Sequence, residues 1–288
     1  MVKSEDVVGR VEASYTQWYA EELPLPGESG AAPLEGGLKL IEDYTGLSRE
    51  EVRRHVKDIR DKSYAIYKYP CLGRWRFLPL YLPGFPEYQN ILSRLKSGEK
   101  LLDAGCCFGH VLRQLALSGV PAENLAGADV HKEFIDLGYE LFQDRDRFQA
   151  RFVVGDVLNS SPSLDSLDGQ FSIIHASSFF HLFGWDDQVK IGTRLVRFFQ
   201  PESTTAMVVG RQVGRYEAPS VEAWREEQAR GVEGKSKNYH HDLKSWQLMW
   251  DEIGGKTGTM WEVSGEFFSR VADGIASPIL QYTVKKVT

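Results

Sequence analysis

Hydrophobic residues in the first third of this chain recur every three or four positions, which is the spacing of amphipathic helices. Ser48 and Glu51 have the spacing of a capping box and predict that a helix begins there. Residues 24–37 are rich in proline, glycine and serine, so we expect a loop. The expected helices of this region cover residues 5–22, 49–63 and 86–97.

After residue 98 the pattern changes to short apolar runs that alternate with segments of helical spacing. Such alternation is typical of a parallel, doubly wound α/β sheet. The last two apolar runs have no helix between them, so we expect an antiparallel pair at the sheet edge. The expected strands cover residues 100–105, 124–130, 151–157, 171–177, 204–211, 259–266 and 277–286. The expected helices between them cover residues 109–118, 132–143, 187–199, 219–229 and 242–253.

The change of pattern also predicts the domain organisation. Residues 1–97 form a helical N-terminal cap, and residues 98–288 form the α/β core. A long polar segment at about 211–256 interrupts the core, and we expect it on the side where a substrate binds.

The composition limits the classes of function. Acidic residues outnumber basic ones and give a net charge of −6, which argues against a general nucleic-acid-binding protein. The three cysteines form neither a CxxC pair nor a disulfide framework, so we expect a reduced, cytoplasmic protein without a metal site. The N-terminus lacks the apolar core of a signal peptide, and the most apolar stretch, 171–185, is too short to span a membrane.

The sequence LLDAGCCFGH, at the end of the first expected strand, has the features of a ligand-binding turn. Open α/β sheets bind ligands at the carboxyl ends of their strands, and glycines such as Gly105 and Gly109 let a ligand approach the backbone closely. Acidic residues end the first three strands, namely Asp103, Asp129 and Asp156. A carboxylate after the second strand suits a ribose diol, because it can accept hydrogen bonds from both hydroxyls.

Two classes of cofactor could bind at such a turn. A dinucleotide site requires Gly-x-Gly-x-x-Gly, but Cys107 and His110 replace two of its glycines, and Asp103 would repel a pyrophosphate. S-adenosylmethionine has no phosphate and carries positive charge, so it tolerates acidic surroundings. The sequence here resembles the class I S-adenosylmethionine-dependent methyltransferases, whose first motif is acid-x-Gly-x-Gly-x-Gly. Asp103, Gly105 and Gly109 match that motif, and Cys107 replaces its middle glycine.

This resemblance implies a Rossmann-like fold with a seven-stranded methyltransferase sheet, and S-adenosylmethionine as the cofactor. Asp129 would bind the ribose, Asp156 would contact the adenine amine, and Val157 would lie beside the adenine ring. His175, within or at the end of the fourth strand, is expected on the cofactor side or in the core. The cofactor-binding residues that the resemblance implies are Asp103, Gly105, Cys107, Gly109, Asp129, Val130, Asp156, Val157 and His175.

The segments outside the core are rich in aromatic residues and predict an apolar pocket for a small hydrophobic substrate. The run YPCLGRWRFLPLYLPGFPEY, in front of a short core, is similar to fungal methyltransferases of meroterpenoid and polyketide-terpenoid pathways. Some members of that group methylate a carboxylate to a methyl ester. Arg74 and Arg76 would suit this reaction, since a guanidinium can bind a carboxylate in an apolar pocket.

Other acceptors stay open. A hydroxyl or phenol needs a base, which His181, just after the fourth strand, could supply. A small-molecule N- or C-methyltransferase is a further alternative, although HASSFF stands where many N-methyltransferases have Asn/Asp-Pro-Pro-Tyr/Phe. A scaffold that binds the cofactor without turnover is the non-enzymatic alternative, and the complete set of acids argues against it. The sequence allows a homodimer.

Overall fold

The computed structural model describes residues 19–28, 31–231, 237–272 and 275–287. They form two compact units, of which the first consists of residues up to Tyr88 with Cys107–Ser118 and His131–Phe148, and the second of Gln89–Cys106, Gly119–Val130 and Gln149–Thr288. The helix expected at 5–22 falls mostly on residues 1–18, outside the described residues, and residues 19–22 are not helical. The division into cap and core after residue 97 stays a prediction.

The second unit is built on a mixed seven-stranded sheet with the order β3-β2-β1-β4-β5-β7-β6. β1 to β5 are parallel, and β7 runs antiparallel to both β5 and β6. This confirms the expected doubly wound sheet with an antiparallel pair at one edge. The strands are β1 (Leu101–Ala104), β2 (Leu125–Asp129), β3 (Arg151–Val154), β4 (Ile173–His175), β5 (Met207–Val213), β6 (Met260–Ala272) and β7 (Ile275–Val287).

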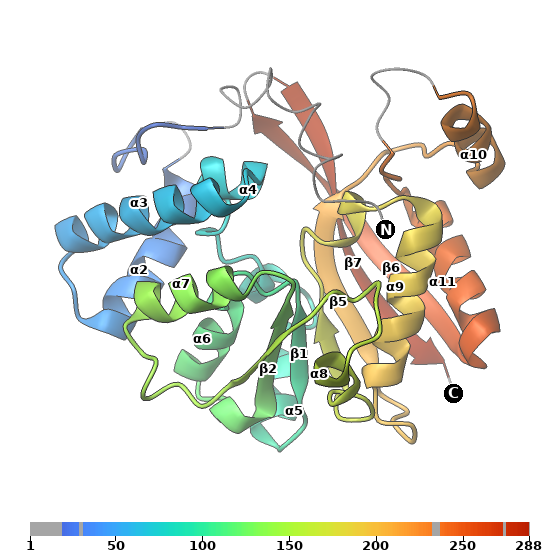
Figure 1. Ribbon diagram of the computed structural model, residues 1–288, viewed down its shortest axis with the longest axis horizontal. Helices are drawn as coiled ribbons and strands as arrows, with labels where there is room; N and C mark the ends of the chain where they lie inside the picture. Colours follow the sequence, from blue (N-terminus) through green and yellow to red (C-terminus); the bar gives the residue numbers. More distant parts are fainter. Residues whose placement is uncertain (1–18, 29–30, 232–236, 273–274, 288) are drawn as a thin grey trace. The chain divides into compact units, whose positions relative to one another are not determined.

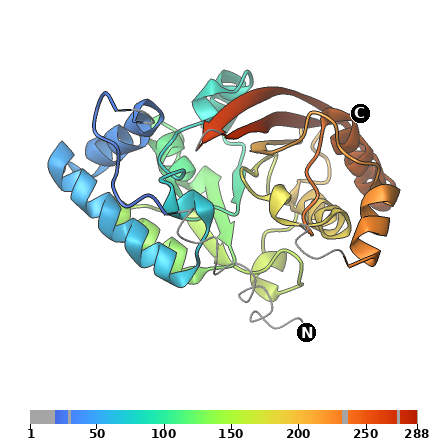
Figure 2. The ribbon, with the colours of Figure 1, turned by 90° about the horizontal axis from the view of Figure 1, so that it is seen from above.

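Helices α9 (Trp185–Phe198) and α11 (Leu243–Thr257) cover one face of the sheet beside β5, β7 and β6 (Figure 1). Apolar side chains of the strands, including Leu102, Ile174 and Val208, form a buried core on this side. The strands β6 and β7 extend into a long, curved two-stranded hairpin (Figure 2). The remaining helical segments assigned to this unit are α5 (Tyr88–Lys96), η4 (Ala122–Asn124), α8 (Pro162–Asp165), η5 (Phe180–Leu182) and α10 (Val221–Ala229).

The first unit is helical. Its longest helix, α3, packs against α2 and α7, and Val52, Val56 and Ile59 of α3 are completely buried in its core (Figure 1). Ser48 and Glu51 form the expected capping box at the start of α3. The helical segments of this unit are η2 (Ala32–Leu34), α2 (Glu35–Thr45), α3 (Arg49–Ile66), α4 (Pro70–Gly73), η3 (Leu82–Gly84), α6 (His110–Leu117) and α7 (Lys132–Phe142).

The expected loop at 24–37 is wrong at its C-terminal end, because α2 begins at Glu35 and includes two glycines. Glycine disfavours a helix, which conceals α2 in the sequence. The structure gives the reason for one of the glycines: a Cβ on Gly37 would lie 2.1 Å from the Leu78 carbonyl oxygen. Gly37 is therefore required for close packing, which overrides its low helix propensity.

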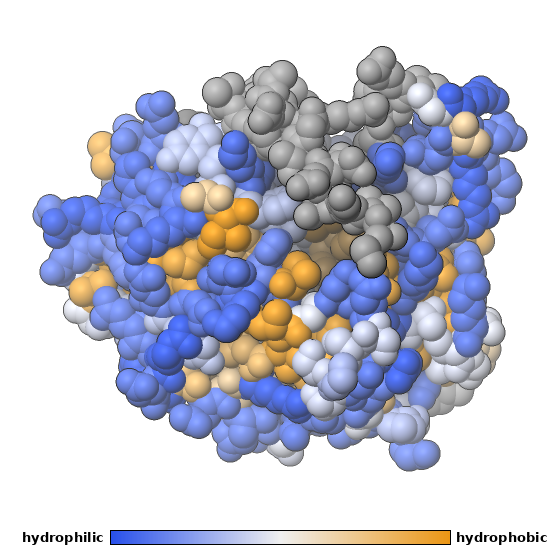
Figure 3. All heavy atoms as spheres, viewed as in Figure 1, coloured by the Kyte–Doolittle hydropathy of each residue, from blue (hydrophilic) through white to orange (hydrophobic). Residues whose placement is uncertain are grey.

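The face of the protein drawn in Figure 3 carries mainly hydrophilic side chains, with apolar side chains between them. Within the described part of the chain, no helix combines the length and the apolar character needed to cross a membrane.

Candidate functional site

Asp103 and His175 occupy paired positions near the carboxyl ends of β1 and β4. His175 Nδ1 lies 2.7 Å from Asp103 Oδ1, and His175 Nε2 lies 2.8 Å from Ser177 Oγ. The backbone N–H of Arg211, in β5, donates to Ser177 Oγ at 3.2 Å. Asp103 and His175 are only 3% and 4% exposed. These residues form a continuous hydrogen-bonded chain across three neighbouring strands, with a buried carboxylate at one end.

The turn after β1 has a backbone that favours glycine. Gly105 has a φ of +74°, and a Cβ at this position would lie 2.8 Å from the Phe179 ring. The N–H groups of Gly105 and Cys106 both donate to the carbonyl of Ala128, which holds the turn against β2. Glycine adopts this conformation without strain and leaves room for the Phe179 ring to pack against the turn.

The motif continues into the first unit with Cys107 and Gly109. Cys107 has a φ of +50° and Gly109 a φ of +63°, so both lie in the left-handed region. Cys107 therefore adopts the conformation that glycine favours, at the position where the motif lacks its middle glycine. Gly109 is the N-cap of α6.

Asp129 is the last residue of β2 and is half-buried. Its carbonyl accepts the N–H of Gly155 at 3.0 Å, which joins the ends of β2 and β3. The next residue, Val130, is 52% exposed. An acid and an exposed apolar side chain therefore follow each other at this strand end.

Asp156 follows β3 and caps its own turn. Its carboxylate accepts the N–H of Leu158 at 3.0 Å and the side-chain amide of Asn159 at 2.6 Å. Each carboxylate oxygen has two lone pairs, so Asp156 keeps the capacity to accept another hydrogen bond. Val157 is half-buried and packs against the core of the second unit.

His181 lies in η5, in the segment after β4, and is half-buried. Its ring centroid is 6.2 Å from that of His240, which also forms a hydrogen bond with the His181 backbone. Burial, with Arg215 nearby, lowers the pKa of His240. The lowered pKa favours the neutral form of His240 and also makes it a weaker base.

Arg74 and Arg76 belong to the first unit and are half-buried. Between them, Trp75 has a φ of +59°, which is rare for a bulky residue. Its indole N–H donates to the Glu22 carbonyl at 3.1 Å, and the Arg60 guanidinium lies 3.8 Å from its ring centroid. These contacts hold a strained backbone between the two arginines, and such strain often accompanies a functional site.

The chemistry at the strand ends fits S-adenosylmethionine. Asp103, Asp129 and Asp156 lie at the ends of β1, β2 and β3, which are adjacent in the sheet. A pyrophosphate would face three carboxylates there, whereas a cationic cofactor would be attracted by them. The left-handed Gly105 packs directly against the Phe179 ring, which leaves no room for a side chain in the turn after β1.

Sequence reasoning missed Ser177, which belongs to the hydrogen-bonded chain that ends at Asp103. A signal was present, because Ser177 follows His175 by two positions and alternate residues of a strand point to the same face. The sequence offered no means of showing that the partner on the neighbouring strand would be Asp103.

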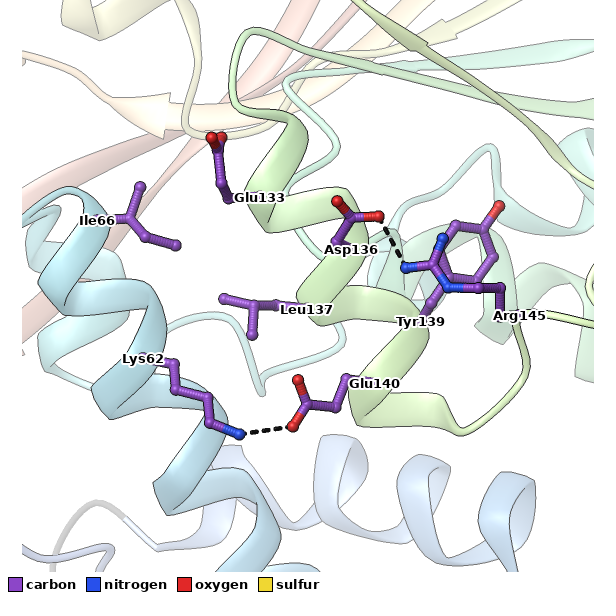
Figure 4. A pocket seen from close by; sticks show the side chains of 8 residues that line it. All are labelled: Lys62, Ile66, Glu133, Asp136, Leu137, Tyr139, Glu140 and Arg145. Atoms are coloured by element: carbon purple, nitrogen blue, oxygen red, sulfur yellow. Dashed lines mark hydrogen bonds and ion pairs between the residues drawn. The ribbon is translucent and has the colours of Figure 1, made fainter.

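A groove of about 420 Å³ lies between α3 and α7 of the first unit (Figure 4). Each of the two cations that line it pairs with an acid: Lys62 with Glu140 at 2.6 Å, and Arg145 with Asp136 at 2.7 Å. The groove therefore presents no uncompensated cation for an acidic substrate. In the ranges that the structure describes, no cluster of three or more His, Cys, Asp or Glu residues could hold a metal ion.

Residues 18–78 match the family described as "Meroterpenoid methyltransferase N-terminal domain", and residues 101–202 match the family "Methyltransferase domain". The chain is 38% identical over 267 residues to the O-methyltransferase phiE of a fungal species, covering 90% of this chain and 84% of that protein. It is 36% identical over 260 residues to the Asnovolin E/Chermesin D methyltransferase nvfJ of Aspergillus novofumigatus, covering 88% and 89% of the two chains.

Among solved structures, the chain is similar to the magnesium protoporphyrin IX methyltransferase of Synechocystis with bound S-adenosylhomocysteine. The sequence identity is 13%, the match covers 69% of this chain and 81% of that one, and the TM-score is 0.42. The two fungal relatives, each matched over most of its length, establish the family. The chain belongs to the same methyltransferase family as these two fungal relatives, and it is an S-adenosylmethionine-dependent methyltransferase.

Proposed function

We propose that this enzyme methylates an oxygen atom of a hydrophobic secondary metabolite, and that the oxygen belongs to a carboxylate, so that the product is a methyl ester. The assignment of oxygen as the acceptor atom is supported by the 38% identity, over 90% of this chain, to a protein named as an O-methyltransferase. The match of residues 18–78 to the meroterpenoid methyltransferase family supports a terpenoid-like substrate.

S-adenosylmethionine supplies an electrophilic methyl group on a sulfonium, which is an excellent leaving group. In our proposal Asp103 would face the positively charged methionine part. Asp129 would accept hydrogen bonds from the ribose hydroxyls, and Asp156 would accept one from the adenine amine. Val130, with half of its surface exposed, and Val157 would give the adenine ring apolar contacts.

The left-handed residues of the turn after β1 would let the cofactor approach the backbone closely. They are Gly105, Cys107 and Gly109, with φ values between +50° and +74°. A larger side chain at Gly105 would compete for space with the Phe179 ring.

A carboxylate acceptor is ionised at neutral pH and needs no base. The enzyme's main task would then be to align the carboxylate with the methyl group and to exclude water. Removing a carboxylate from water is costly unless a cation compensates its charge, and Arg74 or Arg76 would supply that cation. A charge-assisted hydrogen bond of this kind stabilises a bound carboxylate by about 1.5–3 kcal/mol.

The adjacent rings of His181 and His240 support one alternative, a hydroxyl or phenol acceptor. Their centroids are 6.2 Å apart, which brings together two imidazoles that can each accept a proton in the neutral form. A base in this position would be needed for a hydroxyl but not for a carboxylate. The two acceptors therefore predict opposite sensitivities to the loss of a histidine and of an arginine.

The test is methyl transfer from tritium-labelled S-adenosylmethionine to a panel of apolar carboxylic acids and their hydroxyl analogues. Mild base should release the label from the acid products, because esters hydrolyse and ethers do not. Arg74→Met or Arg76→Met should raise KM for the acid about tenfold or more, and Arg54→Met, at an exposed arginine of α3, is the matched control. Base-stable label, or a His181→Ala loss of about 100-fold with no arginine effect, would favour the hydroxyl acceptor.

A further inference from the structure

We propose that His175 and Ser177 are positioning residues, which hold the Asp103 carboxylate for the positively charged methionine part of the cofactor. They would act through Asp103 and would not contact the cofactor themselves. This role rests on the proposed function of Asp103 and adds two residues that determine how that carboxylate is presented.

The hydrogen bonds give the chain a direction. An ionised carboxylate can only accept, so the proton of the bond between Asp103 Oδ1 and His175 Nδ1 lies on the histidine. In a neutral ring Nε2 then accepts, and the Ser177 hydroxyl donates to it. The Arg211 N–H donates to Ser177 Oγ in turn. With His175 in this neutral form, every donor points along the chain toward Asp103, and such aligned bonds strengthen one another.

Asp103 needs this support because it is almost completely buried, at 3% exposure. An isolated buried carboxylate is unstable unless hydrogen bonds or a cation compensate for lost water. On the β2 side, Asp103 is paired with Gly127, which has no side chain to offer. On the β4 side it is paired with His175, which supplies the holding contact.

The choice of histidine has an electrostatic consequence. A buried arginine or lysine beside Asp103 would fix the carboxylate but would also cancel its negative charge. A neutral imidazole that donates one hydrogen bond fixes the carboxylate and leaves that charge in place. In a site of low dielectric constant, the remaining charge attracts a cationic ligand more strongly than it would in water. In its neutral form, His175 together with Ser177 therefore holds the carboxylate without cancelling its negative charge.

Both ring nitrogens of His175 are engaged by protein atoms, and the residue is 4% exposed. These contacts favour a supporting role over the direct cofactor contact expected from the sequence. The distinction can be measured, since a supporting residue affects only the part of the cofactor that Asp103 recognises.

The experiment compares two ligands by calorimetric titration of the full-length chain. S-adenosylmethionine carries the charged methionine part, whereas 5′-methylthioadenosine has the adenine, ribose and thioether but no amino-acid group. His175→Leu should weaken binding of S-adenosylmethionine about tenfold or more and leave binding of methylthioadenosine unchanged. His175→Asn, which keeps an N–H donor near Asp103, should recover most of that loss. Ser177→Ala should weaken S-adenosylmethionine about threefold.

His241→Leu is the matched control. His241 is also a buried histidine of the second unit, and its two ring nitrogens lie 3.1 Å from Ser245 Oγ and 3.1 Å from Gln188 Oε1. Its loss should lower thermal stability without changing the ratio of the two affinities. If His175→Leu weakens both ligands equally, or neither, the positioning role is wrong.

Asp103→Asn distinguishes the proposed contact between Asp103 and the cofactor from the proposed support of Asp103 by His175. If Asp103→Asn selectively weakens S-adenosylmethionine while His175→Leu has no selective effect, Asp103 contacts the cofactor as proposed but needs no support from His175. If Asp103→Asn leaves the affinity ratio unchanged, the proposed contact of Asp103 is itself wrong, and the positioning role falls with it.

Discussion

Replacing Arg113 by methionine should destabilise the protein severely. Arg113, in α6, donates to both carboxylate oxygens of Asp144 at 2.7 and 2.8 Å, and to the Phe108 carbonyl at 2.8 Å. Both charged side chains of the pair are 0% exposed. The ion pair therefore lies in the core of the first unit, at the helix that begins directly after the glycine turn.

The size of the loss follows from what remains after the substitution. Methionine fills much of the volume of the arginine but leaves the Asp144 carboxylate buried without its cation. Breaking a buried pair in this way costs about 3–5 kcal/mol, whereas replacing both partners by apolar residues is often neutral or stabilising. We therefore expect Arg113→Met to lose about 3–5 kcal/mol of unfolding free energy. Arg113→Met with Asp144→Leu should recover most of that loss.

The assay is equilibrium unfolding in urea, followed by circular dichroism and by tryptophan fluorescence so that separate transitions of the two units are detected. Lys39→Ala is the control, because Lys39 forms an exposed ion pair with Asp43 in the same unit, with side chains 65% and 50% exposed. Such a pair contributes only about 0.3–0.5 kcal/mol. The reasoning is refuted if Arg113→Met costs no more than Lys39→Ala, or if the double variant is as unstable as the single one.

Three further substitutions test other parts of the second unit. Burial lowers the pKa of His241 to about 3, so the unfolded chain binds a proton below pH 6.5 that the folded chain excludes. As the pH is lowered below 6.5, the unfolding free energy should decrease by up to about 1.4 kcal/mol per pH unit. His241→Gln should lack this decrease in urea titrations between pH 5 and 8. Gly105→Ala should cost about 1–2 kcal/mol because φ is +74° there, and a loss of thermal stability no larger than that of an exposed glycine would contradict it. Gln212→Met should raise the unfolding free energy by about 1–2 kcal/mol. The reason is that neither polar atom of the buried Gln212 side chain has a hydrogen-bond partner among the described residues. An unchanged or lower urea midpoint would contradict this prediction.

The strands were predictable because each is a short apolar run bounded by turn residues. The five parallel strands and the antiparallel edge pair all appear where the sequence indicated them. α2 was not predictable in the same way, because its glycines conceal a helix whose stability comes from contacts with residues far along the chain. Gly37 packs against the Leu78 backbone, and local propensity contains no information about that contact.

The positions of the acids were predictable for a geometric reason. The carboxyl ends of parallel strands meet at one edge of a sheet, so Asp103, Asp129 and Asp156 had to lie at that edge once the strands were identified. Their detailed contacts depend on facts that the sequence does not contain. Asp156, for example, caps its own turn through Leu158 and Asn159, which the strand pattern alone did not indicate.

The hydrogen-bonded chain from Ser177 to Asp103 shows which part of the site the sequence could predict and which part it could not. Alternation in the strand already places His175 and Ser177 on one face, because Ile174 and Ala176 both point into the core on the other. The same alternation in β1 separates Asp103 from Leu102, which lies in that core. What the sequence lacks is the order of the strands and the register between β1 and β4. A slip of one residue would turn His175 to the opposite face and leave the Asp103 carboxylate buried without its donor. The register that buries the two sets of apolar residues together is therefore also the register that assembles the hydrogen-bonded chain, so packing of the core determines which side chain faces the Asp103 carboxylate.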